Sequence, residues 1–179
     1  ALVDLPFALP TAVAGITLSI PTADGDSEQA RTVQAYRSLA RPHSLVVNRT
    51  GRRFADESFY PYLLEGLCQF DSHQRRFANF PSYWIVDEQF RQSFALTEAY
   101  DWDPGLTPYP DIESLARACE IDPEGLKRTL EVFNRDCETG VDTAFHRGSN
   151  EYAKSMGAMD DTRTRKNPTL GTVAVAPFY

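Results

Sequence analysis

The chain has 179 residues, enough for one domain or slightly more, and its 42% apolar and 24% charged residues are ordinary for a globular protein. Its net charge of −7 argues against nucleic acid and anionic membrane surfaces as partners. The apolar runs are only a few residues long, far short of the ~20 residues that a membrane span needs, so we expect no span.

Residues 1–30 are predicted to be largely irregular, apart from one extended piece at residues 16–20. A turn at residues 24–27 precedes a predicted helix over residues 28–39, which Asp26 or Ser27 would cap. Residues 44–48 form a β-branched run that is typical of a buried strand. A turn at residues 49–52 would then bring Arg53 and Phe54 back as the second strand of a hairpin.

Apolar residues at three- and four-residue spacing predict a helix over residues 58–70, with Pro61 in its first turn and a buried face that consists of Phe59, Tyr62, Leu63, Gly66, Leu67 and Phe70. Residues 82–87 are rich in aromatic and β-branched side chains and read as a strand. Asp87 can cap the helix that we expect at residues 88–96.

Asp111 is predicted to cap a short helix that reaches residue 119. Asp122 and Pro123 open the clearest helix of the chain, which Gly140 should end. A short helix near residues 150–156 and an apolar strand at residues 172–176 follow. Because short strands and helices mix without a regular βαβ alternation, we predict an α+β fold with a small, mostly antiparallel sheet surrounded by helices.

Several kinds of site are disfavoured by the distribution of reactive residues. The histidines lie far apart without ligands at metal-binding spacing, so we expect no metal site. The odd number and wide spacing of the three cysteines, together with the lack of a signal peptide, predict reduced thiols in a cytoplasmic protein. Cys119 and Cys137 should be packing residues on helices. The ten glycines form no Gly-x-Gly pair, so the chain carries no dinucleotide-binding fingerprint.

Three segments resemble one family of flavoproteins, which includes fumarate reductases, succinate dehydrogenase flavoproteins and ketosteroid dehydrogenases. Residues 41–57 are similar to its V-N-x-x-G-x-R-F-x-x-E segment, and residues 83–87 to its W-x-x-x-D strand. Residues 121–179 repeat its order of a helix with L-x-x-T-x-x-x-[YF]-N, then G-x-D-x-x-F-x-R, then P-F-Y. The resemblance covers the capping, or substrate, domain of that family, which is inserted into an FAD-binding Rossmann domain.

The resemblance implies a fold of the flavoprotein capping-domain type, with residues 1–40 as a leading segment and residues 41–179 as the capping domain. The chain starts without Met and stops in an apolar run, so we expect it to be a piece of a larger protein whose FAD-binding Rossmann domain lies outside it. The family moves a hydride between flavin and substrate, here a ketosteroid-like or enoate substrate. We expect FAD to bind the full-length protein, but not this fragment tightly, and the fragment alone to be inactive.

The family also implies candidate site residues. Fumarate reductases carry a proton-donating Arg four residues after the motif Glu, and Δ1-type ketosteroid dehydrogenases a Tyr; here that position is Pro61. The flanking phenols of Tyr60 and Tyr62 are therefore the catalytic candidates. Tyr60 is preferred as the phenol that faces the cleft, because Tyr62 falls on the apolar face of its helix, where a core position is expected. Phe59 and Tyr179 are the candidates for substrate binding. The remaining motif residues, expected to be structural, are Asn48, Gly51, Arg53, Phe54, Glu57 and Arg147.

Two readings without flavin chemistry remain open at this point. The chain could be a free-standing α+β binding module without catalytic activity, in which the same motif residues serve only the fold. A self-contained hydrolase is the weaker alternative, because the sequence shows no nucleophile elbow and no cysteine–histidine pair. Arg53 with Glu57 is expected to form an ion pair in either case.

Overall fold

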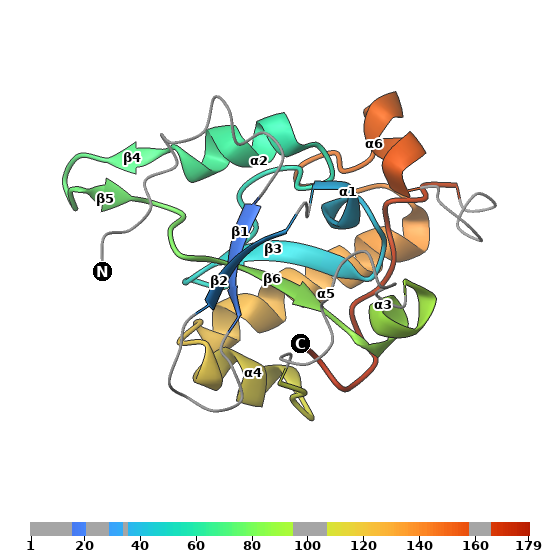
Figure 1. Ribbon diagram of the computed structural model, residues 1–179. Helices are drawn as coiled ribbons and strands as arrows, with labels where there is room; N and C mark the ends of the chain where they lie inside the picture. Colours follow the sequence, from blue (N-terminus) through green and yellow to red (C-terminus); the bar gives the residue numbers. More distant parts are fainter. Residues whose placement is uncertain (1–15, 21–28, 34–35, 95–106, 158–165) are drawn as a thin grey trace.

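The computed structural model describes residues 16–20, 29–33, 36–94, 107–157 and 166–179 (Figure 1). They form an α+β fold, as predicted, but the strands make three separate two-stranded antiparallel ladders and not one sheet. The ladders pair β1 (Ile16–Ile20) with β2 (Gln29–Val33), β3 (Ser44–Asn48) with β6 (Ser82–Val86), and β4 (Phe70–Asp71) with β5 (Arg76–Phe77). The helices are α1 (Tyr36–Leu39), α2 (Tyr60–Leu67), α3 (Glu88–Ser93), α4 (Ile112–Ala118), α5 (Pro123–Thr139) and α6 (Glu151–Gly157).

The β3–β6 ladder lies between two layers of helices (Figure 1). On one face, Leu45, Val47 and Ile85 pack in the main core against α4 and α5. On the other face, Val46 packs against Leu39 of α1 and Leu63 of α2. Successive residues of β3 thus point into two different cores, which is why its sequence is a continuous apolar run and not an alternating one.

The helix signals at α3, α4 and α5 are confirmed. The side chains of Asp87, Asp111 and Asp122 each accept a hydrogen bond from a backbone N–H in the first turn. Gly140 ends α5 in the left-handed conformation, at φ 73°. α6 and the extended piece at residues 16–20 are also present where they are predicted.

The expected hairpin at residues 44–54 is wrong. The turn itself forms, with hydrogen bonds from Gly51 N to Asn48 O at 2.9 Å and from Asn48 N to Arg52 O at 3.0 Å. The partner of β3, however, is β6, in the register Ser44↔Val86 to Asn48↔Ser82. The chain after the turn leaves the ladder, because the side chain of Arg53 forms buried ion pairs with Glu57 and Asp142.

Three other predicted elements need correction. Part of the helix expected at residues 28–39 is strand β2, followed only by the single turn of α1. The helix expected at residues 58–70 ends at Leu67, so Phe70 lies in β4 and is 55% exposed. The expected strand at residues 172–176 is irregular, because Ala174 N and Val175 N donate to the Asp87 side chain and not to a neighbouring strand. The cap predicted at Asp26 or Ser27 lies outside the described residues.

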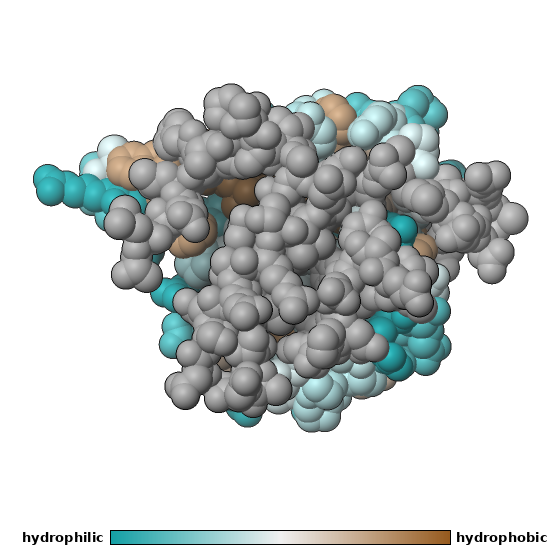
Figure 2. Space-filling view, in the orientation of Figure 1, coloured by the Kyte–Doolittle hydropathy of each residue, from teal (hydrophilic) through white to brown (hydrophobic). Residues whose placement is uncertain are grey.

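The surface is polar over the parts that project furthest. Figure 2 shows hydrophilic residues at the tip of the β4–β5 ladder and over α3, and a hydrophobic patch between α2 and α6. Within the described residues, no helix is long and apolar enough to cross a membrane.

Candidate functional site

The loop that precedes α2 is organised by Asn48 and Gly51. The Asn48 side chain accepts hydrogen bonds from Thr50 N at 3.0 Å, Thr50 Oγ1 at 2.8 Å and Arg52 N at 3.2 Å. Gly51 has φ 69°, and a Cβ there would overlap the backbone of Leu126 in α5. Thr129 Oγ1 also donates to Gly51 O at 2.6 Å, so the loop is fixed directly against α5. Both residues thus shape the backbone that leads to Arg53.

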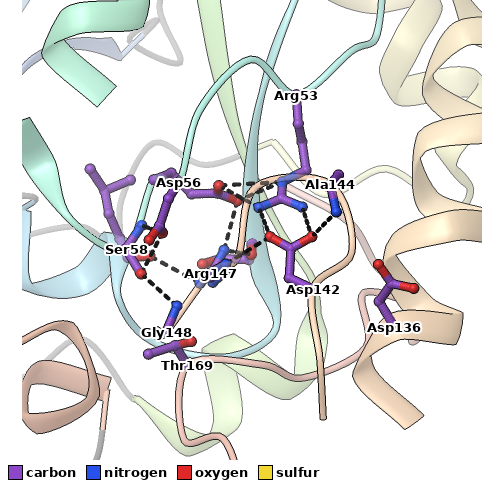
Figure 3. Close-up of polar contacts among 12 residues, drawn as sticks. Arg53, Asp56, Ser58, Asp136, Asp142, Ala144, Arg147, Gly148 and Thr169 are labelled. Carbon is purple, nitrogen blue, oxygen red and sulfur yellow. Dashed lines mark hydrogen bonds and ion pairs between the residues drawn. The ribbon is translucent and has the colours of Figure 1, made fainter. Parts of the chain in front are cut away.

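Arg53 joins two carboxylates inside the protein (Figure 3). Its guanidinium donates to Glu57 at 2.8 Å and to both oxygens of Asp142, at 3.0 and 2.9 Å. All three side chains are nearly inaccessible to solvent. The ion pair expected between Arg53 and Glu57 is therefore present, and it has a second acidic partner that lies 89 residues along the chain from Arg53.

Arg147 is the second cation of this buried network. Its guanidinium donates to Glu57 Oε1 at 2.7 Å and to three backbone carbonyls: Ser44 O at 2.8 Å, Arg41 O at 2.8 Å and Leu39 O at 3.0 Å. Its side chain is completely buried. Both guanidinium groups also lie over the ring of Phe133, at 5.0 Å for Arg53 and 5.7 Å for Arg147. Arg147 therefore links α1 and β3 to the loop that contains Glu57 through its hydrogen bonds.

Pairing shifts the pKa values of Asp142 and Arg53. Burial by itself raises the pKa of Asp142, but the hydrogen bonds and charge of Arg53 outweigh it and lower the pKa to about 2. Burial likewise opposes the charged form of Arg53, whereas the Glu57 and Asp142 carboxylates raise the pKa of Arg53 above its ordinary value. Two cations and two carboxylates thus balance in charge, as a buried network requires.

Asp56 and Ser58 lie next to this network and are also buried. Asp56 Oδ1 accepts hydrogen bonds from Ser58 Oγ at 2.5 Å and from Ser58 N at 2.9 Å. Ser58 Oγ in turn accepts one from Gly148 N at 3.3 Å, just before α6 (Figure 3). Burial raises the pKa of Asp56. Its other oxygen, Oδ2, is buried and has no hydrogen-bond partner among the described residues.

An aromatic cluster follows directly after this network. Phe59 lies edge-to-face with Tyr62 at 5.0 Å between ring centroids, and 6.1 Å from the tilted ring of Tyr60. Tyr62 is 48% exposed, so its predicted place in the buried face of α2 is wrong. The reason is that α2 is short and turns only Leu63 fully inward. The structure therefore brings three of the four aromatic candidate residues together at the N-terminal end of α2.

The cluster has a fourth member that the sequence did not identify. Tyr152 of α6 lies edge-to-face with Phe59, at 6.1 Å between centroids. A helix at residues 150–156 was predictable, but nothing in its local pattern indicates that it contacts a segment 90 residues earlier. The aromatic cluster is, from here on, Phe59, Tyr60, Tyr62 and Tyr152.

Tyr179 lies in a different part of the structure. Its backbone pairs with Val86 at the end of β6, and its hydroxyl donates to Glu88 Oε2 of α3 at 3.1 Å. Burial and this hydrogen bond raise the pKa of Tyr179. Its ring packs with Val86, Phe90 and Phe94. Tyr179 thus lies at α3 and apart from the α2 candidates, and its role in substrate binding stays a prediction.

A cavity of about 470 Å³ lies at the C-terminal end of α5. It is lined by backbone and side chains of α5, by His43 and Gln89, and by the segment from Lys166 to Thr172. Burial raises the pKa of Cys137 at its border to about 12, so this thiol stays protonated near neutral pH. Within the described residues, no group of three or more His, Cys, Asp or Glu side chains could hold a metal ion.

These residues do not fit FAD. A dinucleotide needs closely approaching backbone N–H groups around its pyrophosphate, which Gly-x-Gly turns at helix N-termini provide. The sequence has no such turn, and the cavity at α5 lies at a helix C-terminus, where the helix dipole disfavours anions. In the part of the chain that the structure describes, this cavity therefore offers no pyrophosphate site of that kind.

Comparison with known proteins relates the chain to dehydrogenases of ring ketones. It is 33% identical over 161 residues to the 4-oxocyclohexanecarboxylate 2-dehydrogenase of Sinomonas cyclohexanicum, a match that covers 87% of the chain and 28% of that enzyme. It is 29% identical over 160 residues to the 3-oxosteroid 1-dehydrogenase of Mycolicibacterium smegmatis, covering 77% of the chain and 26% of the enzyme. The chain thus spans little more than a quarter of the length of these relatives. No protein-family model matches it.

Solved structures agree with these relatives. The crystal structure of 3-ketosteroid Δ1-dehydrogenase from Sterolibacterium denitrificans, in complex with 1,4-androstadiene-3,17-dione, superposes with a TM-score of 0.68 at 25% identity, over 92% of this chain and 30% of that one. The open conformation of a flavocytochrome c3 fumarate reductase shares the fold, with a TM-score of 0.56 at 20% identity, over 91% of this chain and 24% of that one. The predicted relationship is confirmed: homologues and structural neighbours are FAD-dependent dehydrogenases, matched over part of their length.

Proposed function

Because the homologues of this chain are FAD-dependent dehydrogenases matched over about a quarter of their length, we propose that it is the capping domain of such an enzyme. In this proposal residues 41–179 form the capping domain and residues 1–40 lead into it. The enzyme moves a hydride between flavin and a ring ketone of the ketosteroid type or a related enoate. The observation that carries the proposal is that two kinds of ring-ketone dehydrogenase match most of the chain.

The tasks of this chain are binding, orientation and proton transfer. Desaturation of a ring next to its carbonyl removes a hydride from one carbon and a proton from its neighbour. Flavin chemistry, supplied from outside this chain, accounts for the hydride. A domain that closes over the substrate excludes water from that step. The proton requires a side chain that lies within hydrogen-bond reach of the ring.

We propose that the phenol of Tyr62 transfers this proton, with Tyr60 as the second candidate. Pro61 occupies the position of the family's proton-transferring residue and has no suitable group, whereas the phenol of Tyr62 is one residue away. Tyr62 is 48% exposed on the aromatic cluster, so a ligand can reach it. Its neighbour Phe59 offers an apolar surface next to the hydroxyl, which suits a carbocyclic substrate.

The test uses the full-length protein that contains this chain. We expect it to hold about one FAD per chain and to reduce a dye acceptor in the presence of 4-oxocyclohexanecarboxylate or a 3-ketosteroid. Tyr62→Phe should lower kcat by about 10²–10⁴-fold, the usual contribution of a positioned acid or base. Tyr83→Phe, a tyrosine of β6 outside the cluster, serves as the matched control and should leave kcat unchanged.

Two results would contradict the proposal at different levels. A full-length protein that binds no flavin and turns over neither ketone would exclude the dehydrogenase and favour the free-standing binding module. The full-length protein could instead be active, with the wild-type kcat in Tyr62→Phe and a lowered kcat in Tyr60→Phe. That result would show that Tyr60, and not Tyr62, transfers the proton.

A further inference from the structure

We propose that Tyr152 of α6 is a specificity-determining residue, which extends the aromatic cluster so that it contacts a second ring of the substrate and favours fused-ring ketones over monocyclic ones. The inference rests on the proposed function, because it places the substrate on the aromatic cluster. It goes further in assigning a role to α6, a helix that the family motifs do not include.

The arrangement of the rings carries this inference. The ring of Phe59 lies between those of Tyr62 and Tyr152, edge-to-face with each, at 5.0 and 6.1 Å. Tyr62 and Tyr152 are 48% and 47% exposed, while Phe59 is half-buried. Phe59 therefore links an exposed ring of α2 with an exposed ring of α6.

The spacing of these rings suits more than one substrate ring. Stacked and edge-to-face contacts place ring centroids about 4.5–7 Å apart. A single ring that contacts Tyr62 can also reach Phe59, whereas Tyr152 is connected to Tyr62 through Phe59, at 6.1 Å between the Phe59 and Tyr152 ring centroids. Fused rings that place their reacting carbon at Tyr62 can extend to Tyr152. Tyr152 should therefore contribute to the binding of a polycyclic ketone and little to that of a monocyclic one.

The buried network joins the segment before α6, which carries Tyr152, to the segment before α2, which carries Tyr62. Arg147 is bound to Glu57, and Gly148 N is bound to Ser58 Oγ, so the segment before α6 is joined to the segment before α2 at two points. Asn150 caps α6, since its side chain accepts a hydrogen bond from Tyr152 N at 2.8 Å. On its inner side, α6 buries Ala153 completely and packs Gly157 against Ala40 and Thr169. Tyr152 thus has a fixed backbone and an exposed ring, as recognition of a rigid ligand requires.

The experiment measures kcat and KM of the full-length protein with a four-ring 3-ketosteroid and with 4-oxocyclohexanecarboxylate. We expect Tyr152→Ala to lower kcat/KM for the steroid by about five- to tenfold, mainly through KM, because an aromatic contact is lost. The value for the monocyclic ketone should change by less than about twofold, since its ring does not reach Tyr152. Tyr152→Phe keeps the ring and should behave as the wild type.

Phe70→Ala is the matched control. Phe70 is a similarly exposed aromatic residue in an edge-to-face pair, but its partner is Phe77 on the β4–β5 ladder. Its removal should change neither substrate. Tyr152→Lys is a second variant that replaces the ring with a long side chain suited to a half-exposed helix position. It should reproduce the effect of Tyr152→Ala even if the smaller residue lowers the stability of α6.

The possible results separate this inference from the proposed function. Equal losses for both ketones in Tyr152→Ala and Tyr152→Lys, or no loss for either, would overturn the role of Tyr152 while leaving the dehydrogenase intact. A wild-type enzyme that is active only on the monocyclic ketone would also overturn the role of Tyr152 and leave the dehydrogenase intact. A wild-type protein that turns over neither ketone would overturn the proposed function, and this inference with it.

Discussion

Replacing Arg147 by methionine removes the guanidinium on which the buried network depends. Methionine is similar in length and apolar, so the change deletes charge and hydrogen bonds with little change in volume. Four acceptors lose a hydrogen bond: the backbone carbonyls of Leu39, Arg41 and Ser44, and the Glu57 carboxylate, which keeps only Arg53 as its cation. None of these four interactions is longer than 3.0 Å.

The expected cost follows from that geometry. Removing one partner of a buried ion pair costs about 3–5 kcal/mol. Without Arg147, Arg53 is left as the one cation of the network, facing the two buried carboxylates of Glu57 and Asp142. Each buried acceptor that loses its donor adds about 1–3 kcal/mol where water cannot replace it, although the terms are not additive. We therefore expect a loss near the upper end, about 5 kcal/mol. A domain with a free energy of unfolding of about 5–15 kcal/mol would then be barely folded.

Urea unfolding of the 179-residue chain, followed by circular dichroism, measures this loss. Thermal unfolding gives a second measure of the same loss. For a chain of this size a loss of 1 kcal/mol lowers the thermal midpoint by about 2–4 °C, so a loss of about 5 kcal/mol should lower it by at least about 10 °C. Arg117→Met is the matched control. Arg117 pairs with Glu113 on the surface of α4, and its side chain is 70% exposed. Its replacement should change the free energy of unfolding by less than about 0.5 kcal/mol.

A loss below about 1 kcal/mol in Arg147→Met, similar to that of the control, would refute the reasoning. It would mean that water or a rearranged neighbour satisfies Glu57 and the three carbonyls. The double variant Arg147→Met with Glu57→Gln provides a further check. It should recover part of the loss, because the glutamine removes the excess negative charge and leaves Arg53 paired with Asp142.

Three further predictions follow from other parts of the structure. The pKa of Asp142 lies near 2, below its ordinary 3.8, so its carboxylate stabilises the folded state above about pH 4, and this contribution is lost as the pH falls towards 2. The difference in unfolding free energy between the wild type and Asp142→Asn should shrink over that pH range, and a constant difference would contradict the assignment. Gly51→Ala should destabilise the chain by clearly more than Gly140→Ala: both glycines have positive φ, but only at Gly51 does a Cβ overlap backbone, and equal urea midpoints would be inconsistent with this. Exposed Cys68 should react with iodoacetamide at pH 8 well before Cys137, whose pKa is about 12; mass mapping that finds Cys137 labelled first would show that the thiol is not buried as described.

Local elements were predicted well where their signals lie within a few residues of one another. Asp122, Pro123 and Gly140 mark both ends of α5 through bonds that each reach no further than one turn. The same holds for the caps at Asp87 and Asp111. The ion pair of Arg53 with Glu57 was also predictable, because the two residues are four positions apart.

Pairing between distant segments was not predictable from such signals. β3 buries residues on both of its faces, so its sequence shows no alternation that would indicate its partner, and the nearest run was mistaken for it. The site shows the same difference. Phe59, Tyr60 and Tyr62 were found as neighbours in sequence, while Tyr152 was missed and Tyr179 proved to lie against Glu88.

The α+β class, the ends of the main helices, the family resemblance and its motif residues can all be read from the amino-acid sequence, because they depend on residue type and on short spacing along the chain. Three features become visible only in the folded chain: β3 pairs with β6, Arg147 reaches Glu57 across 90 residues, and Tyr152 joins the aromatic cluster. Buried charges are paired, and apolar faces are covered, by whichever segments the packed core brings together. Because these segments can lie far apart along the chain, short-range sequence patterns do not indicate them.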